Sequence, residues 1–308
     1  MCGIMGYIGK ENALPFIVDG LRRESYRGYD SSGVVVFDGG KTHYVKAVGK
    51  LEKLEEKLAG MQITGTVGLG HNRWATHGEV TELNAHPHTD CKQNIFVVHN
   101  GIIENYQVLK EALQAKGHVF VSQTDTEVLA HLIEEYFKGD LKQAVAEALL
   151  QVKGAYAIAV IAKQDPEKIV VARLSSPLVI AKTDSGVFVA SDPAAIVSHT
   201  KNMVFLDDGE IAVITKDSFL VTDAKNVAHE KTATQLAWNM EEIQKAGFAH
   251  FMQKEIMQQP QTLAQSLAGR VLVDEGEAKL GGLEELKNAV KNISQIRLIG
   301  CGSAFFAI

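Results

Sequence analysis

The sequence predicts an α/β fold whose strands pair mainly in antiparallel sheets. Short apolar runs of β type alternate with amphipathic helical stretches along most of the chain. Several of these runs crowd residues 155–221 with no spacer long enough for a helix. Parallel neighbours need a long crossover connection, so this crowding favours antiparallel pairing.

The individual elements follow from the local patterns. The predicted strands are short apolar runs at residues 4–8, 33–37, 67–69, 95–98, 155–161, 169–172, 178–180, 187–190 and 211–214. The predicted helices show apolar residues at helical spacing, near residues 13–24, 51–58, 106–116, 126–137 and 141–150. Glycine, more than the 6 prolines, separates these elements.

Composition changes near Thr232, which predicts three parts. Residues 1–234 form the main α/β domain, and residues 235–280 read as a polar helical linker. Residues 281–308 contain a predicted helix near 284–290 and a predicted strand at 295–300, followed by Cys301-Gly302-Ser303-Ala304. A strand running into such a turn is typical of the opening of a parallel βα unit, so we expect the truncated start of a second domain.

Charge and cysteine content exclude several classes of protein. The 308 residues carry a formal net charge of −6 and are 46% apolar, which is typical of a globular protein and not of a general nucleic-acid binder. No apolar run approaches the roughly 18 residues that span a bilayer, and the N-terminus does not resemble a signal peptide. The 3 cysteines form no CxxC pair. We therefore expect a cytoplasmic protein with no nucleic-acid or membrane partner.

Cys2 is the first candidate for chemistry. If Met1 is removed, the α-amine of Cys2, with a pKa of ~7.7–8.0, lies beside its own thiol. A terminal residue can then supply both nucleophile and general base. The alternative is that Cys2 is a small buried apolar residue.

Residues 71–88, HNRWATHGEVTELNAHPH, concentrate histidines around an arginine and a tryptophan. Arg73 beside Trp74, at the end of a short strand, suits capture of a carboxylate, although a solvated surface arginine is the alternative. The spacing of the histidines His71, His77, His86 and His88 matches neither HExxH nor the Cys/His pattern of a zinc finger. We therefore expect core packing and loop hydrogen bonds from them, with no metal site and no cofactor.

Two further segments offer polar groups to a pocket. In VVHNGIIENY, Asn100 and Gly101 follow a β-run and could donate to an oxyanion, although Asn-Gly is more often a simple turn. In SQTDTEV, Thr124 or Asp125 could cap the following helix, or Asp125 could pair with an ammonium group. Together with Cys2 and Arg73, these groups describe a pocket for an amino acid with a side-chain amide or ester, and glutamine fits it.

The quoted motifs lead to a resemblance. MCGIMGYIG, LRRESYRGYDSSG, HNRWATHG, NAHPH, HNGIIENY and QTDTEV closely resemble the glutaminase domain of the class II amidotransferases, which are N-terminal-nucleophile hydrolases. The linker segment HFMQKEIMQQP is similar to the segment that precedes a sugar-isomerase half in the hexosamine-forming members. The resemblance implies a four-layer α/β/β/α sandwich, a homodimer in the full-length form, and ammonia supply for converting fructose 6-phosphate to glucosamine 6-phosphate.

The resemblance also implies roles for individual residues. Cys2 would be the nucleophile supported by Arg27, and Asn100 and Gly101 would form the oxyanion hole. L-glutamine would be held by Arg73 and Asp125. The remaining residues implied to line or close the glutamine site are Trp74, Thr76, His77 and Gly78.

Two departures from the family pattern keep alternatives open. Asn72 stands where the family usually has threonine, and Cys301-Gly302-Ser303-Ala304 replaces Cys-Gly-Thr-Ser, which helps bind the sugar phosphate. The second departure, and the absence of most of the isomerase half, bear on the sugar more than on glutamine. The alternatives are the glutaminase domain of another class II amidotransferase and a truncated, non-catalytic glutamine-binding fragment.

Overall fold

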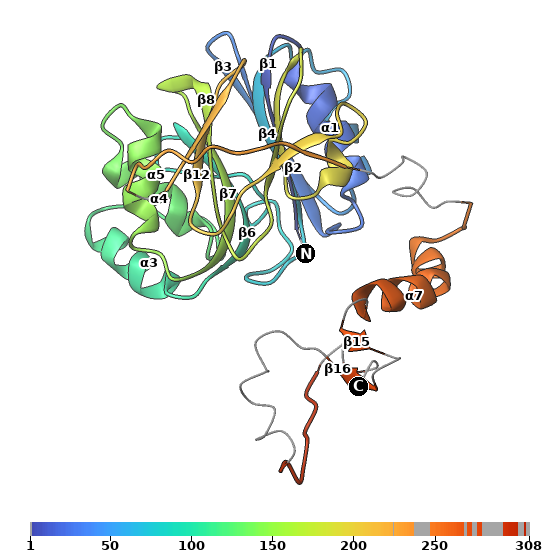
Figure 1. The fold of residues 1–308 in the computed structure, drawn as a ribbon. Helices are drawn as coiled ribbons and strands as arrows, with labels where there is room; N and C mark the ends of the chain where they lie inside the picture. Colours follow the sequence, from blue (N-terminus) through green and yellow to red (C-terminus); the bar gives the residue numbers. More distant parts are fainter. Residues whose placement is uncertain are drawn as a thin grey trace. The chain divides into compact units, whose positions relative to one another are not determined.

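The computed structural model describes residues 2–223, 225–236, 247–267, 270–272, 276–278, 292–300 and 305. The chain divides into two compact units, residues 1–240 and residues 241–308. The first unit contains two large antiparallel sheets with helices on their outer faces (Figure 1). It carries all the candidate site residues named above.

One sheet has eight strands in the order β14-β11-β9-β10-β1-β4-β2-β3. Strand β1 lies inside this sheet and pairs antiparallel with β10 and β4. Its position matters because Cys2 directly precedes it. The strands are β1 Gly3–Gly9, β2 Ser31–Asp38, β3 Lys41–Val48, β4 Val67–Arg73, β9 Val179–Lys182, β10 Gly186–Ala190, β11 Asn202–Phe205 and β14 Thr234–Gln235.

The other sheet has six strands in the order β13-β12-β8-β7-β6-β5. Its members are β5 His88–Thr89, β6 Ile95–Ile103, β7 Gly154–Ala162, β8 Asp165–Leu174, β12 Ile211–Ile214 and β13 Phe219–Thr222. The pairs β6/β7, β7/β8, β8/β12 and β12/β13 are all antiparallel. The antiparallel prediction for residues 155–221 is therefore confirmed.

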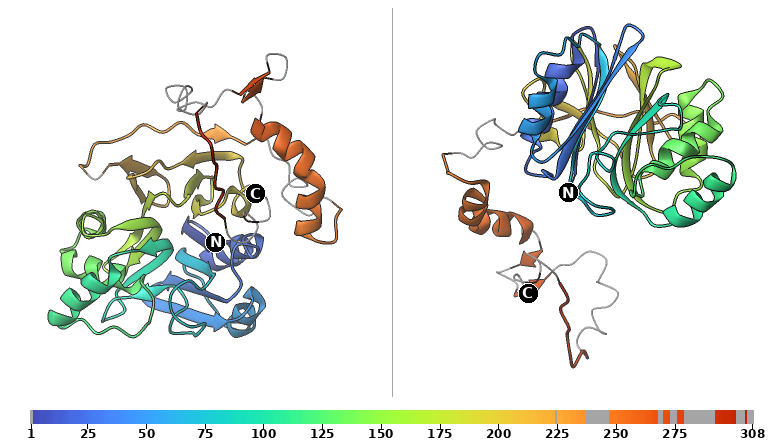
Figure 2. Two further views of the ribbon diagram at one scale, coloured as in Figure 1. Left: turned by 90° about the horizontal axis from the view of Figure 1, so that it is seen from below. Right: turned by 180° about the vertical axis from the view of Figure 1, so that it is seen from behind.

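The two sheets face each other, and helices cover the outer side of each. Side chains from both sheets, among them Ile4, Leu69, Phe96 and Val171, form the core between them. Helices α1 (Ala13–Arg23) and α2 (Leu51–Leu58) pack on the eight-stranded sheet. Helices α3 (Tyr106–Ala115), α4 (Glu127–Tyr136) and α5 (Leu141–Leu149) cover the six-stranded sheet (Figure 2). The four-layer α/β/β/α prediction is confirmed.

The helix ends show how local sequence sets these boundaries. Asn12 caps α1 by accepting a hydrogen bond from the Leu14 N–H at 3.0 Å, and Asp140 caps α5 in the same way. The expectation that Thr124 or Asp125 caps α4 is wrong. The N-cap of α4 is Thr126, with no side-chain cap bond, and the Asp125 carboxylate instead accepts from the Ile103 N–H at 2.7 Å.

Two differences between the predicted and the observed strands bear on the site and on the edge of the sheet. The run predicted at 95–98 continues to Ile103, so Asn100 and Gly101 lie within β6 and not in the turn after it. Strand β3 was not predicted, because its sequence KTHYVKAV is polar and only Ala47 is buried. It lies at the edge of the sheet, where pairing with β2 defines it. The short 3-10 helix Pro193–Ala195 follows β10.

The second unit contains most of the predicted helical linker and all of the predicted βα unit. Helix α7, Phe251–Leu267, lies within the predicted helical linker, and β15 (Val271–Leu272) pairs with β16 (Glu277–Ala278). The predicted strand at 295–300 is wrong. The structure shows no strand at residues 292–300, and the side chains of Ile296 and Ile299 are exposed. A strand needs a neighbouring strand to satisfy its backbone hydrogen bonds, and no strand in the described part of the chain pairs with these residues. The predicted helix at 284–290 and Cys301-Gly302-Ser303-Ala304 lie outside the described residues.

Within the described part of the chain, no helix combines the length and the apolar character needed to cross a membrane.

Candidate active site

Cys2 lies at the start of β1, where the β1/β4 pairing brings it beside the end of β4. Gly3 pairs with Asn72, and the Cys2 Sγ accepts a hydrogen bond from the Trp74 N–H at 3.2 Å. Burial raises the pKa of the Cys2 thiol, and the Trp74 bond and the charge of Arg73 oppose this shift. The thiol is therefore mostly protonated near neutral pH, so its use as a nucleophile would require a base.

Arg27 holds the backbone of Cys2. Its Nε donates to the Cys2 carbonyl oxygen at 3.0 Å, and its Nη1 forms an ion pair with Asp192 at 3.0 Å. The arginine side chain is only 7% exposed, so this pairing fixes it. Glycine at position 28 allows the chain beside it to approach the Arg73 backbone, which a Cβ would meet at 2.8 Å.

Asn100 is the second group on the Cys2 backbone. Its Nδ2 donates to the Cys2 carbonyl oxygen at 3.0 Å, and its Oδ1 lies 3.0 Å from His71 Nε2. Burial lowers the pKa of His71 to about 3, so the ring is neutral at pH 7. Because Nε2 also faces the His99 carbonyl oxygen at 3.1 Å, it must carry the hydrogen and donate to both acceptors. His71 thereby sets which way the Asn100 amide points.

Gly101 follows in the same strand, with φ of 137°. A Cβ at this position would lie 2.0 Å from the Ala155 carbonyl oxygen, so only glycine fits. The residue lines the same cavity as Cys2.

This cavity brings together most of the residues singled out in the sequence. Residues from β4, β6 and the segment before α4 contribute to its wall. It is lined by Cys2, Arg73, Trp74, Thr76, His77, His86, His99, Gly101, Thr124, Asp125 and Thr126. Arg73 and Asp125 thus present opposite charges to one pocket that also contains a thiol.

Arg73 and the loop after β4 support each other. Its Nη1 donates to the Glu79 carbonyl oxygen at 3.1 Å, and its Nη2 donates to the carbonyl oxygens of His77 and Gly78. A guanidinium has five N–H donors, so further donors remain for a bound anion. Gly78 does not line the cavity. Its φ of 75° permits the turn that directs these carbonyls at Arg73.

Asp125 lines the same cavity as Arg73. One carboxylate oxygen accepts from the Ile103 N–H at 2.7 Å, and the other lies 4.0 Å from His77 Nδ1. The side chain is 5% exposed, so its charge acts in a medium where Coulomb interactions are strong. Trp74, by contrast, is 44% exposed and packs edge-on against Tyr29 at the rim.

Buried histidines lie in and beside the lining of this pocket. His71 stacks on His86 at 4.0 Å between ring centroids, and His88 Nε2 lies 3.0 Å from Thr124 Oγ1. Burial lowers the pKa of His71, His86, His88 and His99 alike. Within the described residues these imidazoles do not converge as a metal-ligand group, which supports the packing interpretation over a metal site.

Sequence reasoning did not predict that His86, His99, Thr124 and Thr126 line this cavity, nor that His71 acts on Asn100. His99 lines the cavity and its Nδ1 lies 2.8 Å from Thr126 Oγ1, and His71 orients Asn100. The alternation of side chains along a strand could have indicated the position of His99. His99 and Gly101 share one face of β6 two residues apart.

Comparisons with known proteins show which family the sequence is similar to. A family model described as a glutamine amidotransferase domain matches residues 41–250. Glutamine–fructose-6-phosphate aminotransferase [isomerizing] of Chlorobaculum tepidum is 47% identical over 314 residues, covering 100% of this chain and 51% of the relative. The enzyme of the same name from Thermus thermophilus is 45% identical, covering 100% of this chain and 50% of the relative. The chain therefore spans about half the length of these curated relatives.

Solved structures show the same fold. The glutamine phosphoribosylpyrophosphate amidotransferase of B. subtilis, complexed with ADP and GMP, is 28% identical with a TM-score of 0.64, covering 72% of this chain and 49% of that chain. A glutamine aminotransferase class-II domain protein from Silicibacter pomeroyi is 17% identical with a TM-score of 0.50, covering 72% and 99%. At that identity, the second likeness concerns the fold alone.

Proposed function

The chain belongs to the class II glutamine amidotransferase family, and from this premise we propose that it hydrolyses the side-chain amide of glutamine with Cys2 as nucleophile. The observation that carries the proposal is the convergence of the Cys2 thiol, Arg73 and Asp125 on one cavity. A thiol that shares a cavity with a fixed cation and a fixed anion suits an α-amino acid whose side chain reaches the sulfur.

The proposed reaction uses the terminal amine as base. Once Met1 is removed, the free α-amine of Cys2 takes the thiol proton, and the sulfur attacks the amide carbon of glutamine. Collapse of the tetrahedral adduct breaks the carbon–nitrogen bond, and the proton passes from the amine to the leaving nitrogen, which departs as ammonia. Water then hydrolyses the thioester, which releases glutamate and restores the thiol.

Asn100 and Gly101 would stabilise the oxyanion. The Asn100 amide has two N–H bonds, of which one donates to the Cys2 carbonyl oxygen, so the other is free to serve the substrate oxygen. The His71 contact supports this role, because it prevents the amide from flipping and presenting its oxygen. Such donors act on charge that develops only in the transition state.

The two charged side chains of the cavity would set the orientation in which glutamine binds. Arg73 would bind the α-carboxylate of glutamine and Asp125 its α-ammonium, with Thr76 and His77 beside them and Trp74 at the rim. Arg27 would position the nucleophile through the Cys2 carbonyl. Gly78 would act indirectly, by accepting from Arg73.

For the acceptor, we propose that the ammonia converts fructose 6-phosphate to glucosamine 6-phosphate within a longer, homodimeric cytosolic protein. This proposal is supported by the share of the chain that the relatives match. The fructose-6-phosphate aminotransferases of Chlorobaculum tepidum and Thermus thermophilus match 100% of this chain, including the second unit, at 47% and 45% identity. No nucleic-acid or membrane partner belongs to the proposal.

The test of the glutaminase activity is a glutamate-release assay on purified chain whose mass shows loss of Met1. Hydrolysis of glutamine but not of asparagine supports the proposal, since the distance from the charged walls to the sulfur selects side-chain length. A processed, folded chain that binds glutamine without hydrolysing it would instead support the non-catalytic alternative.

A further inference from the structure

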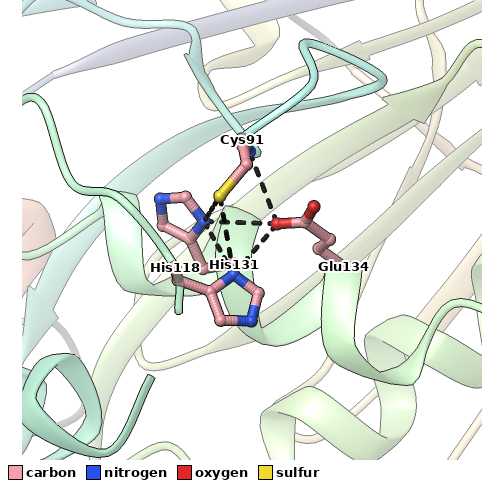
Figure 3. Close-up of side chains that lie close together, drawn as sticks. All are labelled: Cys91, His118, His131 and Glu134. Carbon is pink, nitrogen blue, oxygen red and sulfur yellow. Dashed lines mark hydrogen bonds and ion pairs between the residues drawn. The ribbon is translucent and has the colours of Figure 1, made fainter. Parts of the chain in front are cut away.

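A second cluster of reactive side chains lies outside the Cys2 cavity and shares no residue with it. Cys91 is in the turn between β5 and β6, His118 is in the α3–α4 loop, and His131 and Glu134 lie one turn apart on α4. One ligand atom from each of the four residues lies within 4.8 Å of all the others (Figure 3).

Five of the six distances between the ligand atoms of this cluster have the size that a tetrahedral metal site requires, and the Cys91 Sγ to Glu134 distance is within 4.8 Å. The Nδ1 atoms of His118 and His131 lie 3.2 Å apart, and they lie 3.0 and 3.4 Å from Glu134 Oε2. The Cys91 Sγ lies 3.7 and 3.5 Å from the same two nitrogens. Around Zn²⁺, bonds of ~2.0–2.1 Å to nitrogen or oxygen and ~2.3 Å to sulfur give ligand–ligand separations of about 3.3 and 3.6 Å.

Hydrogen bonding by itself does not account for this arrangement. His118 Nδ1 faces three groups at once, namely the Cys91 sulfur, the His131 nitrogen and the Glu134 oxygen. A ring nitrogen carries one hydrogen at most, and a single hydrogen cannot satisfy all three groups. His131 Nδ1 faces the corresponding three groups. A cation at the centre would satisfy all four lone pairs together.

The outward-facing ring nitrogens strengthen the case. His118 Nε2 donates to Glu135 Oε1 at 2.9 Å, and His131 Nε2 lies 3.6 Å from Glu127 Oε1. Metal-binding histidines characteristically present their other nitrogen to a carboxylate, which fixes the ring and raises its basicity. Both histidine side chains are nearly buried, whereas Cys91 is exposed and leaves a route for an ion.

We propose that Cys91, His118, His131 and Glu134 bind one structural Zn²⁺ ion. Mixed thiolate, imidazole and carboxylate ligands in tetrahedral geometry favour zinc over the hard cations Mg²⁺ and Ca²⁺. This revises the expectation of no metal site. The four positions are spread from 91 to 134 in a spacing that resembles no zinc motif, so only the fold reveals them.

The ion would join three separate segments. It would tie the β5–β6 turn to α4 and to the α3–α4 loop, where the Val119 N–H already lies 3.5 Å from the Cys91 sulfur. The same loop continues to Thr124 and Asp125 at the Cys2 cavity. Zinc would therefore stabilise the segment that carries one wall of that cavity without touching the reacting atoms.

The test measures zinc in a Cys2→Ala background, because a terminal cysteine with a free amine is itself a zinc chelator. After removal of metals with a chelator, the chain is dialysed against micromolar Zn²⁺ and bound metal is counted by elemental analysis. We expect one zinc per chain in this background, and at least a tenfold loss of binding in Cys91→Ser and in Glu134→Gln. The matched controls are Cys301→Ser, which replaces a thiol that is not one of the four proposed ligands, and Glu111→Gln, an exposed carboxylate on α3.

Two further readouts separate binding from folding. Metal-free Cys91→Ser should melt with the metal-free parent, whereas added Zn²⁺ should raise the melting temperature of the parent only. Co²⁺ should give a thiolate charge-transfer absorption that Cys91→Ser lacks, and Glu135→Gln should weaken zinc binding by roughly 10- to 100-fold while keeping that absorption. Absence of stoichiometric zinc, or equal binding by Cys91→Ser, would overturn the proposal. Glutamine hydrolysis enters none of these readouts.

Discussion

The side-chain amide of Asn100 donates from Nδ2 to the carbonyl oxygen of Cys2 at 3.0 Å, across 98 positions of the sequence. This bond joins the two sheets at the proposed nucleophile, because Asn100 lies in β6 and Cys2 precedes β1. The arrangement leaves one amide hydrogen for a substrate oxygen.

Asn100→Ala should therefore lower kcat by ~100-fold or more with little change in KM, since an oxyanion donor acts on the transition state. Steady-state kinetics on the processed chain measure both constants. The matched control is Asn72→Thr. Asn72 donates to the Leu21 carbonyl oxygen at 2.7 Å and accepts from Ser32, away from the cavity. A variant of Asn100 that changes KM alone would exclude the oxyanion role.

Cys2→Ala should abolish hydrolysis while the fold remains intact, because no acyl-enzyme can form without the thiol. A chain that retains Met1 should be equally inactive, since an amide nitrogen cannot serve as the base. Circular dichroism checks folding, and Cys301→Ser provides the control for thiol replacement. Activity of Cys2→Ala within about tenfold of the parent would eliminate Cys2 as the nucleophile.

Asp125→Asn should mainly weaken glutamine capture. Asparagine can still accept from the Ile103 N–H, so this variant removes the charge and keeps the contact that holds the side chain. Loss of one charge-assisted partner costs about 1.5–3 kcal/mol, or roughly 10- to 100-fold in KM.

Arg73→Ala should have the same kinetic effect and should also loosen the loop whose carbonyls Arg73 binds. Isothermal titration with glutamine in the Cys2→Ala background measures binding directly. Unchanged affinity in both the Asp125 and Arg73 variants would refute the proposed substrate polarity.

Stability should fall as pH decreases from 7.5 to 5.5. Burial lowers the pKa of His71, His86, His88 and His99, so below the unfolded value of ~6.5 the unfolded chain binds protons that the folded chain does not. Each histidine then lowers the free energy of unfolding by up to about 1.4 kcal/mol between pH 7.5 and pH 5.5. Burial raises the pKa of the Glu24 carboxyl, so the folded chain binds a proton there that the unfolded chain does not. This one group therefore stabilises the folded chain as the pH falls.

The net effect should be a loss of stability, because four groups outweigh one. Urea unfolding at the two pH values measures it, and His88→Gln, which cannot take up the proton, should flatten the dependence. Equal stability at pH 7.5 and 5.5 would show that these histidines are not neutral in the folded protein.

Features set by residues close together in the sequence could be predicted, whereas features set by contacts between distant residues could not. Helix α2 was predicted at residues 51–58 because its buried residues Leu51, Leu54 and Leu58 recur at helical spacing. The edge strand β3 was missed because it is held by pairing and not by an apolar run. The same distinction applies to the site. Cys2 and Asp125 were candidates by residue type, whereas the role of His71 depends on a contact with Asn100 that only the folded chain creates.

The final prediction concerns the 308-residue chain by itself, which should release ammonia and glutamate without forming glucosamine 6-phosphate. The chain spans about half the length of the relatives named for that reaction. A doubly wound sheet binds its ligand between several strand ends, and residues 292–300 contribute no strand, with Ile296, Leu298 and Ile299 exposed. Incubation with glutamine and fructose 6-phosphate, with both products followed, provides the test, and the full-length Chlorobaculum tepidum enzyme provides the positive control. Glucosamine 6-phosphate formed in step with glutamate would contradict the prediction, since these residues would then suffice for amino transfer.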